Sequence, residues 1–161
     1  MITVLALDID GVLTDGRVTL DESGCEYKTL WYGDIDALFL ARRQGLHVVL
    51  VTGEDSAWVE VVAKRLQVER VYRGTKDKRQ ALRKVSCDLA VRLDQVCYIG
   101  DSSRDADAFP EVGLALVPAD AAEDVRAAAH QVLRHRGGAG AVAEAVELLL
   151  KARGDPPPKR V

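Results

Sequence analysis

Two aspartates one residue apart, Asp8 and Asp10, follow a short apolar run near the N-terminus and precede Gly11. The run, residues 4–7, has the composition of a strand that is buried on both faces of a parallel sheet. In open α/β sheets, ligands bind beyond the carboxyl ends of the strands, which is where both carboxylates would lie. Acids this close repel each other unless a cation offsets their charge. The pair therefore predicts a catalytic site that uses a cation, and the plainer alternative is a strand that ends in an acidic turn.

A hydroxyl, a lysine and two more acids follow later apolar runs of the chain. Because the carboxyl ends of parallel strands meet at one edge of a sheet, we expect these side chains to converge with the twin acids. Three carboxylates form a hard oxygen site that suits Mg²⁺, and a hydroxyl and a lysine near helix N-termini bind phosphate. Together they predict phosphoryl transfer, in which the protein positions groups and neutralises charge. The later residues are Thr52, Lys78, Asp101 and Asp105.

The elements that must position these residues follow from the alternation of apolar runs with helix-forming segments. This alternation predicts an α/β fold, a Rossmann-like parallel sheet with helices on both faces. A turn-forming cluster between β-prone residues predicts a small β-hairpin flap over about residues 17–31, after the first strand. We expect one domain over residues 1–152 and a disordered tail over 153–161. The further expected strands are 46–51, 68–72, 95–100 and 113–117, and the expected helices are 35–44 (capped by Asp34), 57–66, 79–91, 121–129 and 141–151.

Composition narrows the class of protein. A formal net charge of −3 argues against nucleic acid as a partner, because nucleic-acid-binding surfaces are usually basic. No apolar run approaches the roughly 18 residues of a membrane span, so we expect no membrane partner. The first residues lack the pattern of a signal peptide, and the three cysteines, Cys25, Cys87 and Cys97, have no metal-type spacing. We therefore expect reduced thiols and a cytoplasmic protein.

Four segments, in chain order, resemble the motifs of the haloacid dehalogenase (HAD) superfamily, most of whose members are Mg²⁺-dependent phosphatases. The resemblance implies a HAD fold and a phosphatase in which Asp8 is the nucleophile, forming an aspartyl-phosphate, and Asp10 is the general acid and base. It also implies that Asp8, the backbone carbonyl of Asp10 and Asp101 bind Mg²⁺. The four segments are Asp8-x-Asp10-Gly11-Val12, Thr52-Gly53, Lys78 and Gly100-Asp101-x-x-x-Asp105.

The resemblance also assigns residues to the phosphoryl group and to the support of the site. It implies that Thr52, Gly53 and Lys78 bind the phosphorylated substrate. It implies that Asp105 supports the metal site or the lysine. Many relatives carry a second acid where this chain has Ser102, so the supporting residues differ while the metal ligands stay the same.

Each of these assignments has a simpler alternative from residue type alone. Thr52 could be the N-cap of the helix that follows it. Lys76 or Arg79 could contact phosphate in place of Lys78. An acid at Asp105, early in a helix, is stabilised by the helix dipole without any part in the chemistry. The position of each side chain relative to the twin acids distinguishes these alternatives.

The intervals between the motifs are too short for a cap domain. The chain resembles a capless, tetrameric branch of the superfamily that dephosphorylates 3-deoxy-2-ulosonate sugar phosphates, such as octulosonate 8-phosphate and nononate 9-phosphate. That resemblance implies a small phosphorylated sugar acid as substrate and a homotetramer whose core is formed by the hairpins; a solvent-exposed flap is the alternative for the hairpin. In that branch a C-terminal Gly-rich segment reaches toward a neighbouring site. The segments shared beyond the four motifs are Asp15-Gly16, 28–34 and 136–140.

Two departures leave the substrate open. Octulosonate phosphatases typically have arginine after Thr-Gly, whereas this chain has Glu54 and so looks more like the nononate phosphatases. Glu54 could accept hydrogen bonds from substrate hydroxyls, or it could be an acid in the first turn of a helix. The segment 31–36 also lacks the usual Arg-Asp-Gly. Two other functions fit the same scaffold: a non-catalytic HAD-fold oligomerisation module, as in the C-terminal part of some acylneuraminate cytidylyltransferases, and a phosphotransferase.

Overall fold

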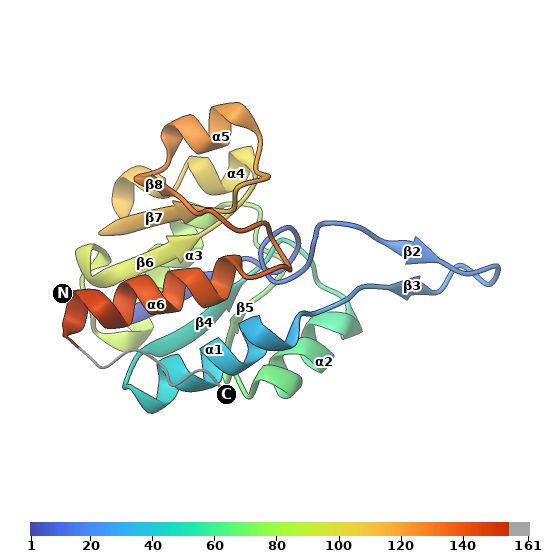
Figure 1. The fold of residues 1–161 in the computed structure, drawn as a ribbon, viewed down its shortest axis with the longest axis horizontal. Coiled ribbons are helices and arrows are strands. Elements are labelled where there is room, and N and C mark those ends of the chain that lie inside the picture. The colour runs from blue at the N-terminus through green and yellow to red at the C-terminus, as the bar shows by residue number, and fades with distance from the viewer. Residues whose placement is uncertain (155–161) are drawn as a thin grey trace.

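The computed structural model describes residues 1–154. Six strands form one sheet, in the order β5 (Arg70–Tyr72), β4 (His47–Val51), β1 (Val4–Leu7), β6 (Val96–Ile99), β7 (Leu114–Val117) and β8 (Gln131–Val132). Every neighbouring pair is parallel. The strand order reverses at β1, whose neighbours β4 and β6 come later in the chain. Figure 1 labels β4 and β6. The predicted α/β sheet is confirmed, and β8 adds a sixth strand that is too short to be expected from an apolar run.

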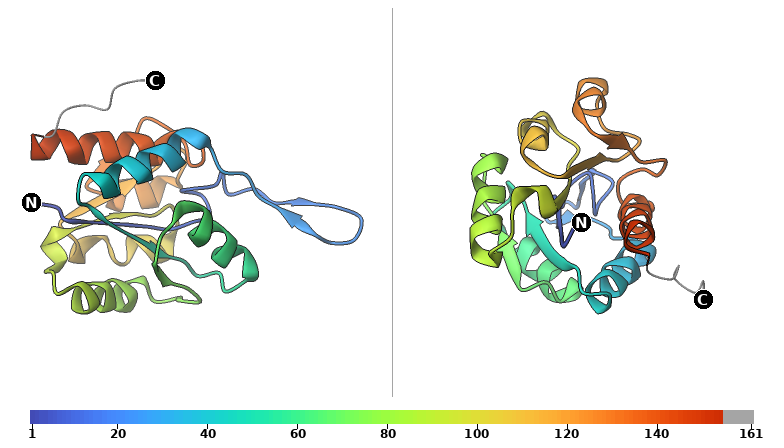
Figure 2. Two further views of the ribbon diagram at one scale, coloured as in Figure 1. Left: turned by 90° about the horizontal axis from the view of Figure 1, so that it is seen from below. Right: turned by 90° about the vertical axis from the view of Figure 1, so that its left-hand side faces the viewer.

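Helices cover both faces of the sheet (Figure 2). They are α1 (Tyr32–Arg43), α2 (Ala57–Leu66), α3 (Lys78–Leu89), α4 (Ser103–Ala106), α5 (Glu123–Ala128) and α6 (Ala141–Arg153), with two 3₁₀ turns at Leu93–Gln95 and Phe109–Glu111. In β1, Leu5 and Leu7 lie in a core shared with α1, α2 and α6. Val4 and Ala6 lie in a second core, shared with α3 and α5. Burial on both faces explains why β1 is apolar at successive positions.

The hairpin predicted after the first strand is present. Its strands, β2 (Thr19–Leu20) and β3 (Glu26–Tyr27), pair antiparallel and extend away from the sheet (Figures 1 and 2). The Asp21 carboxylate accepts hydrogen bonds from the backbone amides of Ser23 and Cys25 at 2.9 and 3.0 Å. The Ser23 hydroxyl, together with these amides, lowers the pKa of Asp21 to about 2. A local hydrogen-bond network therefore closes the tip of a hairpin that has no core of its own.

Asp34 does not cap its own helix, contrary to the prediction. Helix α1 begins at Tyr32, and its N-cap residue is Trp31 in an extended conformation. The buried carboxylate of Asp34 instead accepts hydrogen bonds from the backbone amides of Gly140 and Ala143, at 3.2 and 2.8 Å. These amides lie at the start of α6, where N–H groups lack partners within the helix. Asp34 therefore caps a helix distant in sequence and ties α1 to α6.

Other boundaries differ from the prediction by a few residues. Helix α2 spans the predicted 57–66. Helix α3 begins one residue early, at Lys78, because the carboxylate of Asp77 accepts a hydrogen bond from the amide of Gln80 at 3.1 Å and acts as the N-cap. Helix α6 continues to Arg153. The sequence predicts a disordered tail over 153–161, and residues 155–161 of it lie outside the described residues.

Within residues 1–154, no helix combines the length and apolar composition that a membrane span needs.

The three thiols are free. Cys25 and Cys87 are exposed, and Cys97 is buried within β6. Burial raises the pKa of the Cys97 thiol well above its ordinary value, which keeps it protonated and unreactive. Its role is therefore that of a small core residue.

Candidate active site

The residues predicted to carry the chemistry meet at the carboxyl edge of the sheet. Asp8 directly follows β1, Thr52 directly follows β4, and Asp101 follows β6 after one glycine. Carboxylate oxygens of Asp8, Asp101 and Asp105 all lie within 4.8 Å of one another. The cluster lies where the strand order reverses, which is where open α/β sheets bind ligands.

Lys78 reaches this acid cluster (Asp8, Asp101 and Asp105) from the first turn of α3. Its Nζ atom lies 2.6 Å from Oδ2 of Asp8, 3.2 Å from Oδ1 of Asp105 and 2.8 Å from a carbonyl oxygen at the end of β4. The Lys78 side chain is 3% exposed. The other two basic residues of the segment, at positions 76 and 79, are exposed. Of the three, Lys78 is therefore the one that enters the site.

Asp105 is fully buried and holds the loop that carries Asp101. Its Oδ2 atom accepts hydrogen bonds from the Ser102 hydroxyl at 2.6 Å and from the backbone amides of Ser102 and Asp101 at 3.0 and 3.2 Å. Its Oδ1 atom accepts a hydrogen bond from the Tyr98 hydroxyl. Burial alone would raise the pKa of Asp105, but Lys78 and these hydrogen bonds hold it below its ordinary value. Asp105 therefore stabilises the start of α4 and also faces the lysine.

The acid cluster carries more negative charge than Lys78 can neutralise. Burial raises the pKa of Asp8 to about 6, with Lys78 opposing the shift and Asp105 adding to it. Burial, followed by the charges of Asp105 and Asp8, raises the pKa of Asp101 to about 7. Such shifts are expected where carboxylates share a site of low polarity. A divalent cation would offset this charge, and hard carboxylate oxygens are the ligands that Mg²⁺ prefers.

Asp10 lies at the mouth of the site, where its side chain is 40% exposed. Lys28, just after β3, places its Nζ atom 2.9 Å from Oδ1 of Asp10 and 2.6 Å from Oε2 of Glu54. Burial raises the pKa of Asp10, the hydrogen bond from Lys28 opposes the shift, and Glu54 adds to it. Sequence reasoning assigns no role to Lys28, although the shared segment 28–34 begins with it and it is the one basic residue between positions 18 and 31.

Thr52 and Glu54 lie in the loop between β4 and α2, ahead of the helix. The N-cap residue of α2 is Ser56, so neither the N-cap role considered for Thr52 nor the first-turn position considered for Glu54 holds. The buried Thr52 hydroxyl accepts a hydrogen bond from the Glu54 amide at 3.1 Å. Burial alone would raise the pKa of Glu54, but hydrogen bonds from Lys28 and Ser56 lower it. Gly53, between the two, is exposed on the loop.

The Gly-rich segment 136–140 packs against the loop that carries the twin acids. The amide of Gly138 donates a hydrogen bond to the carbonyl oxygen of Val12 at 3.0 Å. A Cβ atom at Gly137 would overlap the carbonyl oxygen of Gly11. Gly11 itself has a φ of +78°, and a Cβ atom there would overlap a carboxylate of the acid cluster. Segment 136–140 therefore contacts the site of its own chain, at positions where only glycine fits.

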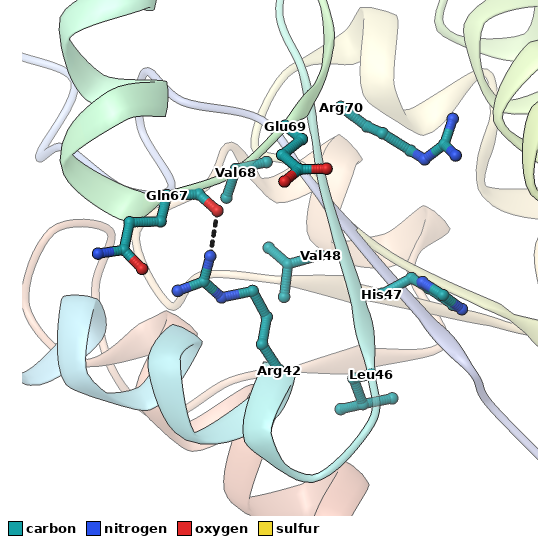
Figure 3. A pocket seen from close by; sticks show the side chains of 8 residues that line it. All are labelled: Arg42, Leu46, His47, Val48, Gln67, Val68, Glu69 and Arg70. Atoms are coloured by element: carbon teal, nitrogen blue, oxygen red, sulfur yellow. Dashed lines mark hydrogen bonds between the residues drawn. The ribbon is translucent and has the colours of Figure 1, made fainter.

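A hollow at the edge of the sheet opposite the acid cluster lacks this chemistry. It has a volume of about 280 Å³ and is lined by residues at the amino ends of β4 and β5, among them His47 and Arg70. The guanidinium of Arg42 points across it and donates a hydrogen bond to the carbonyl oxygen of Gln67 (Figure 3). Its lining residues contribute one carboxylate, that of Glu69. The acid cluster is therefore the candidate active site.

Comparison with known proteins finds similar enzymes along most of this chain. A family model described as haloacid dehalogenase-like hydrolase matches residues 70–146. The chain is 34% identical over 153 residues to the 3-deoxy-D-manno-octulosonate 8-phosphate phosphatase KdsC of Escherichia coli, which covers 95% of this chain and 81% of that protein. It is 33% identical over 152 residues to KdsC of Yersinia pestis, with 94% and 81% covered.

Solved structures share the whole fold. The 3-deoxy-D-manno-octulosonate 8-phosphate phosphatase of Moraxella catarrhalis, in complex with a magnesium ion, a phosphate ion and a KDO molecule, superposes with a TM-score of 0.89 at 34% identity, covering 94% of this chain and 87% of that one. The cobalt-bound deoxy-D-mannose-octulosonate 8-phosphate phosphatase of Haemophilus influenzae superposes with a TM-score of 0.90 at 31% identity, covering 95% and 90%. The sheet and its helices therefore have close structural counterparts in both enzymes.

Proposed function

This chain belongs to the haloacid dehalogenase-like phosphatases, within the 3-deoxy-D-manno-octulosonate 8-phosphate phosphatase family, and we propose on that premise that it hydrolyses the phosphate monoester of a 3-deoxy-2-ulosonate sugar. Octulosonate 8-phosphate and nononate 9-phosphate are the two candidate substrates. The observation that carries the proposal is the cluster of three carboxylates around Lys78 where the strand order reverses. A site of this kind positions a phosphoryl group and neutralises its charge.

In the proposed mechanism the Asp8 carboxylate attacks phosphorus, and the bond between phosphorus and the sugar oxygen breaks as the aspartyl-phosphate bond forms. The protonated carboxyl of Asp10 transfers its proton to the leaving oxygen. Asp10, now ionised, takes a proton from a water molecule, which attacks phosphorus and releases inorganic phosphate and the Asp8 carboxylate. The raised pKa of Asp10 supports this role, because an acid that keeps its proton closer to neutral pH is ready to donate it.

We assign Mg²⁺ binding to Asp8, Asp101 and the backbone carbonyl of Asp10. Asp105 is a supporting residue in this assignment, because both of its carboxylate oxygens already accept hydrogen bonds. When bound, the ion draws negative charge from the phosphoryl oxygens. The Moraxella catarrhalis relative, which holds a magnesium ion and a phosphate ion, supports Mg²⁺ as the metal.

We assign the phosphoryl oxygens to the Thr52 hydroxyl, the Gly53 amide and the Lys78 ammonium group. Lys78 is held in place by Asp8 and by a backbone carbonyl, so its charge is fixed where phosphate would lie. Glu54, at the mouth, is assigned to hydroxyls of the sugar. Because Lys28 offsets its charge, Glu54 need not repel an acidic substrate.

The substrate assignment predicts a clear preference within a panel of phosphate esters. The panel comprises octulosonate 8-phosphate, nononate 9-phosphate, glucose 6-phosphate and a nucleoside monophosphate, and released phosphate is measured with Mg²⁺, with EDTA, and with Mg²⁺ added back. We expect kcat/KM for an ulosonate phosphate to exceed that for glucose 6-phosphate by about 10-fold or more, since a few polar contacts contribute that much discrimination. We expect EDTA to abolish turnover and Mg²⁺ to restore it.

Turnover that persists in EDTA would contradict the metal assignment. A preference for the neutral sugar phosphate would contradict the substrate class while leaving the phosphatase assignment in place. No turnover of any ester would favour the non-catalytic oligomerisation module. Partition of the phosphoryl group to an added alcohol in preference to water would favour a phosphotransferase.

We also propose that the hairpin (residues 17–31) forms the core of a homotetramer. Val18, Leu20 and Tyr27 are exposed on it, and exposed apolar side chains that gather in one place mark interaction surfaces. We expect light scattering to give the mass of four chains and the Leu20→Asp variant to give smaller species. The matched control is Val61→Asp on α2, since Val61 is 63% exposed and Leu20 is 62% exposed. A wild-type monomer would leave the hairpin as a solvent flap.

The cytoplasmic location expected from the sequence stays a prediction.

A further inference from the structure

The geometry points to Lys28 as a positioning residue for Asp10. We propose that Lys28, carried by the hairpin, holds the Asp10 carboxyl in the orientation from which it protonates the leaving oxygen. This inference rests on the proposed phosphatase function and adds to it a residue outside the four motifs. It also gives the hairpin a part in the chemistry of its own chain.

Lys28 joins three separate parts of the chain at the mouth of the site. Its Nζ atom lies 2.9 Å from Oδ1 of Asp10, which follows β1, and 2.6 Å from Oε2 of Glu54, which follows β4. The same Nζ atom lies 4.9 Å from the centre of the Trp58 ring on α2. An ammonium group over an aromatic face is attracted to it. Two ion pairs and the ring therefore fix the end of an otherwise flexible side chain.

The charges at the mouth explain why a cation is needed between the two acids. Without Lys28, no described positive charge would lie between the Asp10 and Glu54 carboxyl groups. An ionised Asp10 would be repelled by Glu54, and a protonated Asp10 would donate its hydrogen bond to Glu54 in place of the leaving oxygen. In either form the Asp10 side chain would leave its present position. Proton transfer requires the donor within hydrogen-bond distance of the acceptor, so a rotated Asp10 would be a poorer acid even in a folded protein.

A direct contact between Lys28 and substrate is the less suitable alternative. The Lys28 side chain is 7% exposed, compared with 40% for Asp10 and 21% for Glu54. Its ammonium group already donates to two carboxylates. The two acids, and not the lysine, are therefore the groups presented to an incoming ester.

The test uses two esters of similar shape that differ in how much they need an acid. p-Nitrophenyl phosphate has a good leaving group that departs with little help, whereas phenyl phosphate has a poorer one that needs a proton. The quantity to measure is kcat/KM, because it reports only the steps through the first irreversible one, where Asp10 acts as acid. We expect Lys28→Met to lower kcat/KM about 30-fold or more for phenyl phosphate and less than about 5-fold for p-nitrophenyl phosphate, since acid catalysis contributes roughly 10²- to 10⁴-fold.

Lys28→Arg keeps the charge, and we expect it to recover most of the loss on phenyl phosphate. Lys64→Met is the matched control, because Lys64 is exposed on α2, and we expect it to leave both rates unchanged. Retained activity of Lys28→Met on p-nitrophenyl phosphate shows that the variant is folded. A change of charge alone would lower kcat/KM equally for both esters. Equal losses on the two esters, or no loss on either, would therefore overturn the role of Lys28. Turnover by the wild type would still support the phosphatase function. A wild-type protein that hydrolyses neither ester would overturn both.

Discussion

The Asp8→Asn variant is expected to lose at least about 10⁴-fold in kcat/KM while keeping its fold, because removing a catalytic nucleophile typically costs this much or more. An amide has the shape of a carboxylate but does not attack phosphorus. The substitution also leaves Lys78 with one carboxylate partner, Asp105, and the carbonyl at the end of β4. Phosphate release from p-nitrophenyl phosphate measures the loss, and circular dichroism checks the fold.

The matched control for this variant is Asp36→Asn, since Asp36 is exposed on α1 and distant from the acid cluster in sequence. We expect Asp36→Asn to keep wild-type activity. A second readout follows from the covalent step: brief reaction with a phosphate ester should label the wild-type chain with an acid-stable phosphoryl mass, and Asp8→Asn should take up none. If Asp8→Asn keeps more than a few per cent of wild-type turnover, Asp8 is not the nucleophile.

The Asp101→Asn variant is expected to have opposite effects on activity and on stability. Activity at limiting Mg²⁺ should fall about 10³-fold, because the variant loses a proposed metal ligand and the ion provides several kcal/mol of charge stabilisation in such reactions. Metal-free stability should rise, because the site loses one of its crowded carboxylates. Burial and the neighbouring acids raise the pKa of Asp101 to about 7, which means that its ionised form costs folding free energy.

The sign of this cost sets its pH dependence. The pKa of Asp101 is higher in the folded chain than in the unfolded one, so the folded state binds the proton more tightly. The group is neutral in both states at pH below its ordinary value of 3.8, where it costs nothing. Its cost grows as pH rises from there and is complete above about pH 7. We therefore expect Asp101→Asn to be more stable than the metal-free wild type by about 2 kcal/mol at pH 8, and by almost nothing near pH 4.

Thermal unfolding at pH 4, pH 5 and pH 8, with and without Mg²⁺, measures the effects on stability, and phosphate release at limiting Mg²⁺ measures the effect on activity. Mg²⁺ should raise the Tm of the wild type at pH 8 and less so at pH 5, because protons compete with the metal for the same carboxylates. It should leave the Tm of Asp101→Asn nearly unchanged. The control is Asp107→Asn, an exposed acid of the same loop region, which should behave as the wild type. An Asp101→Asn variant that is less stable at pH 8, or one whose Tm responds fully to Mg²⁺, would remove Asp101 from the metal site.

The acids and the lysine of the site were predictable because each follows an apolar run. A buried strand shows in the sequence as consecutive apolar residues. In a parallel sheet its carboxyl end lies at the same edge as the carboxyl ends of the other strands. Asp8, Thr52 and Asp101 therefore follow β1, β4 and β6 as expected. The same reasoning located Lys78 in the right segment, but only its burial and its contacts separate it from the two exposed basic residues beside it.

The contacts that sequence reasoning missed are those between side chains and distant backbone. Lys28 pairs with Glu54 across 26 residues, and Asp34 caps the start of α6 across 106 residues. In each case the residue type fits a local role, a hairpin lysine or a helix N-cap, and local patterns predict local roles. Sequence reasoning also missed the two-residue strand β8, because this strand is defined by its pairing with β7 and not by its composition.

The packing of Gly137 and Gly138 behind the twin acids bears on when a newly synthesised chain becomes active. The ribosome makes Asp8 and Asp10 early, whereas the glycines that back their loop emerge after the whole sheet has been translated. Contacts that close such long stretches of chain form late and slowly. The loop that carries Asp8 and Asp10 therefore lacks this support through most of translation. Enzymatic competence is a property that the chain gains only at the end of folding.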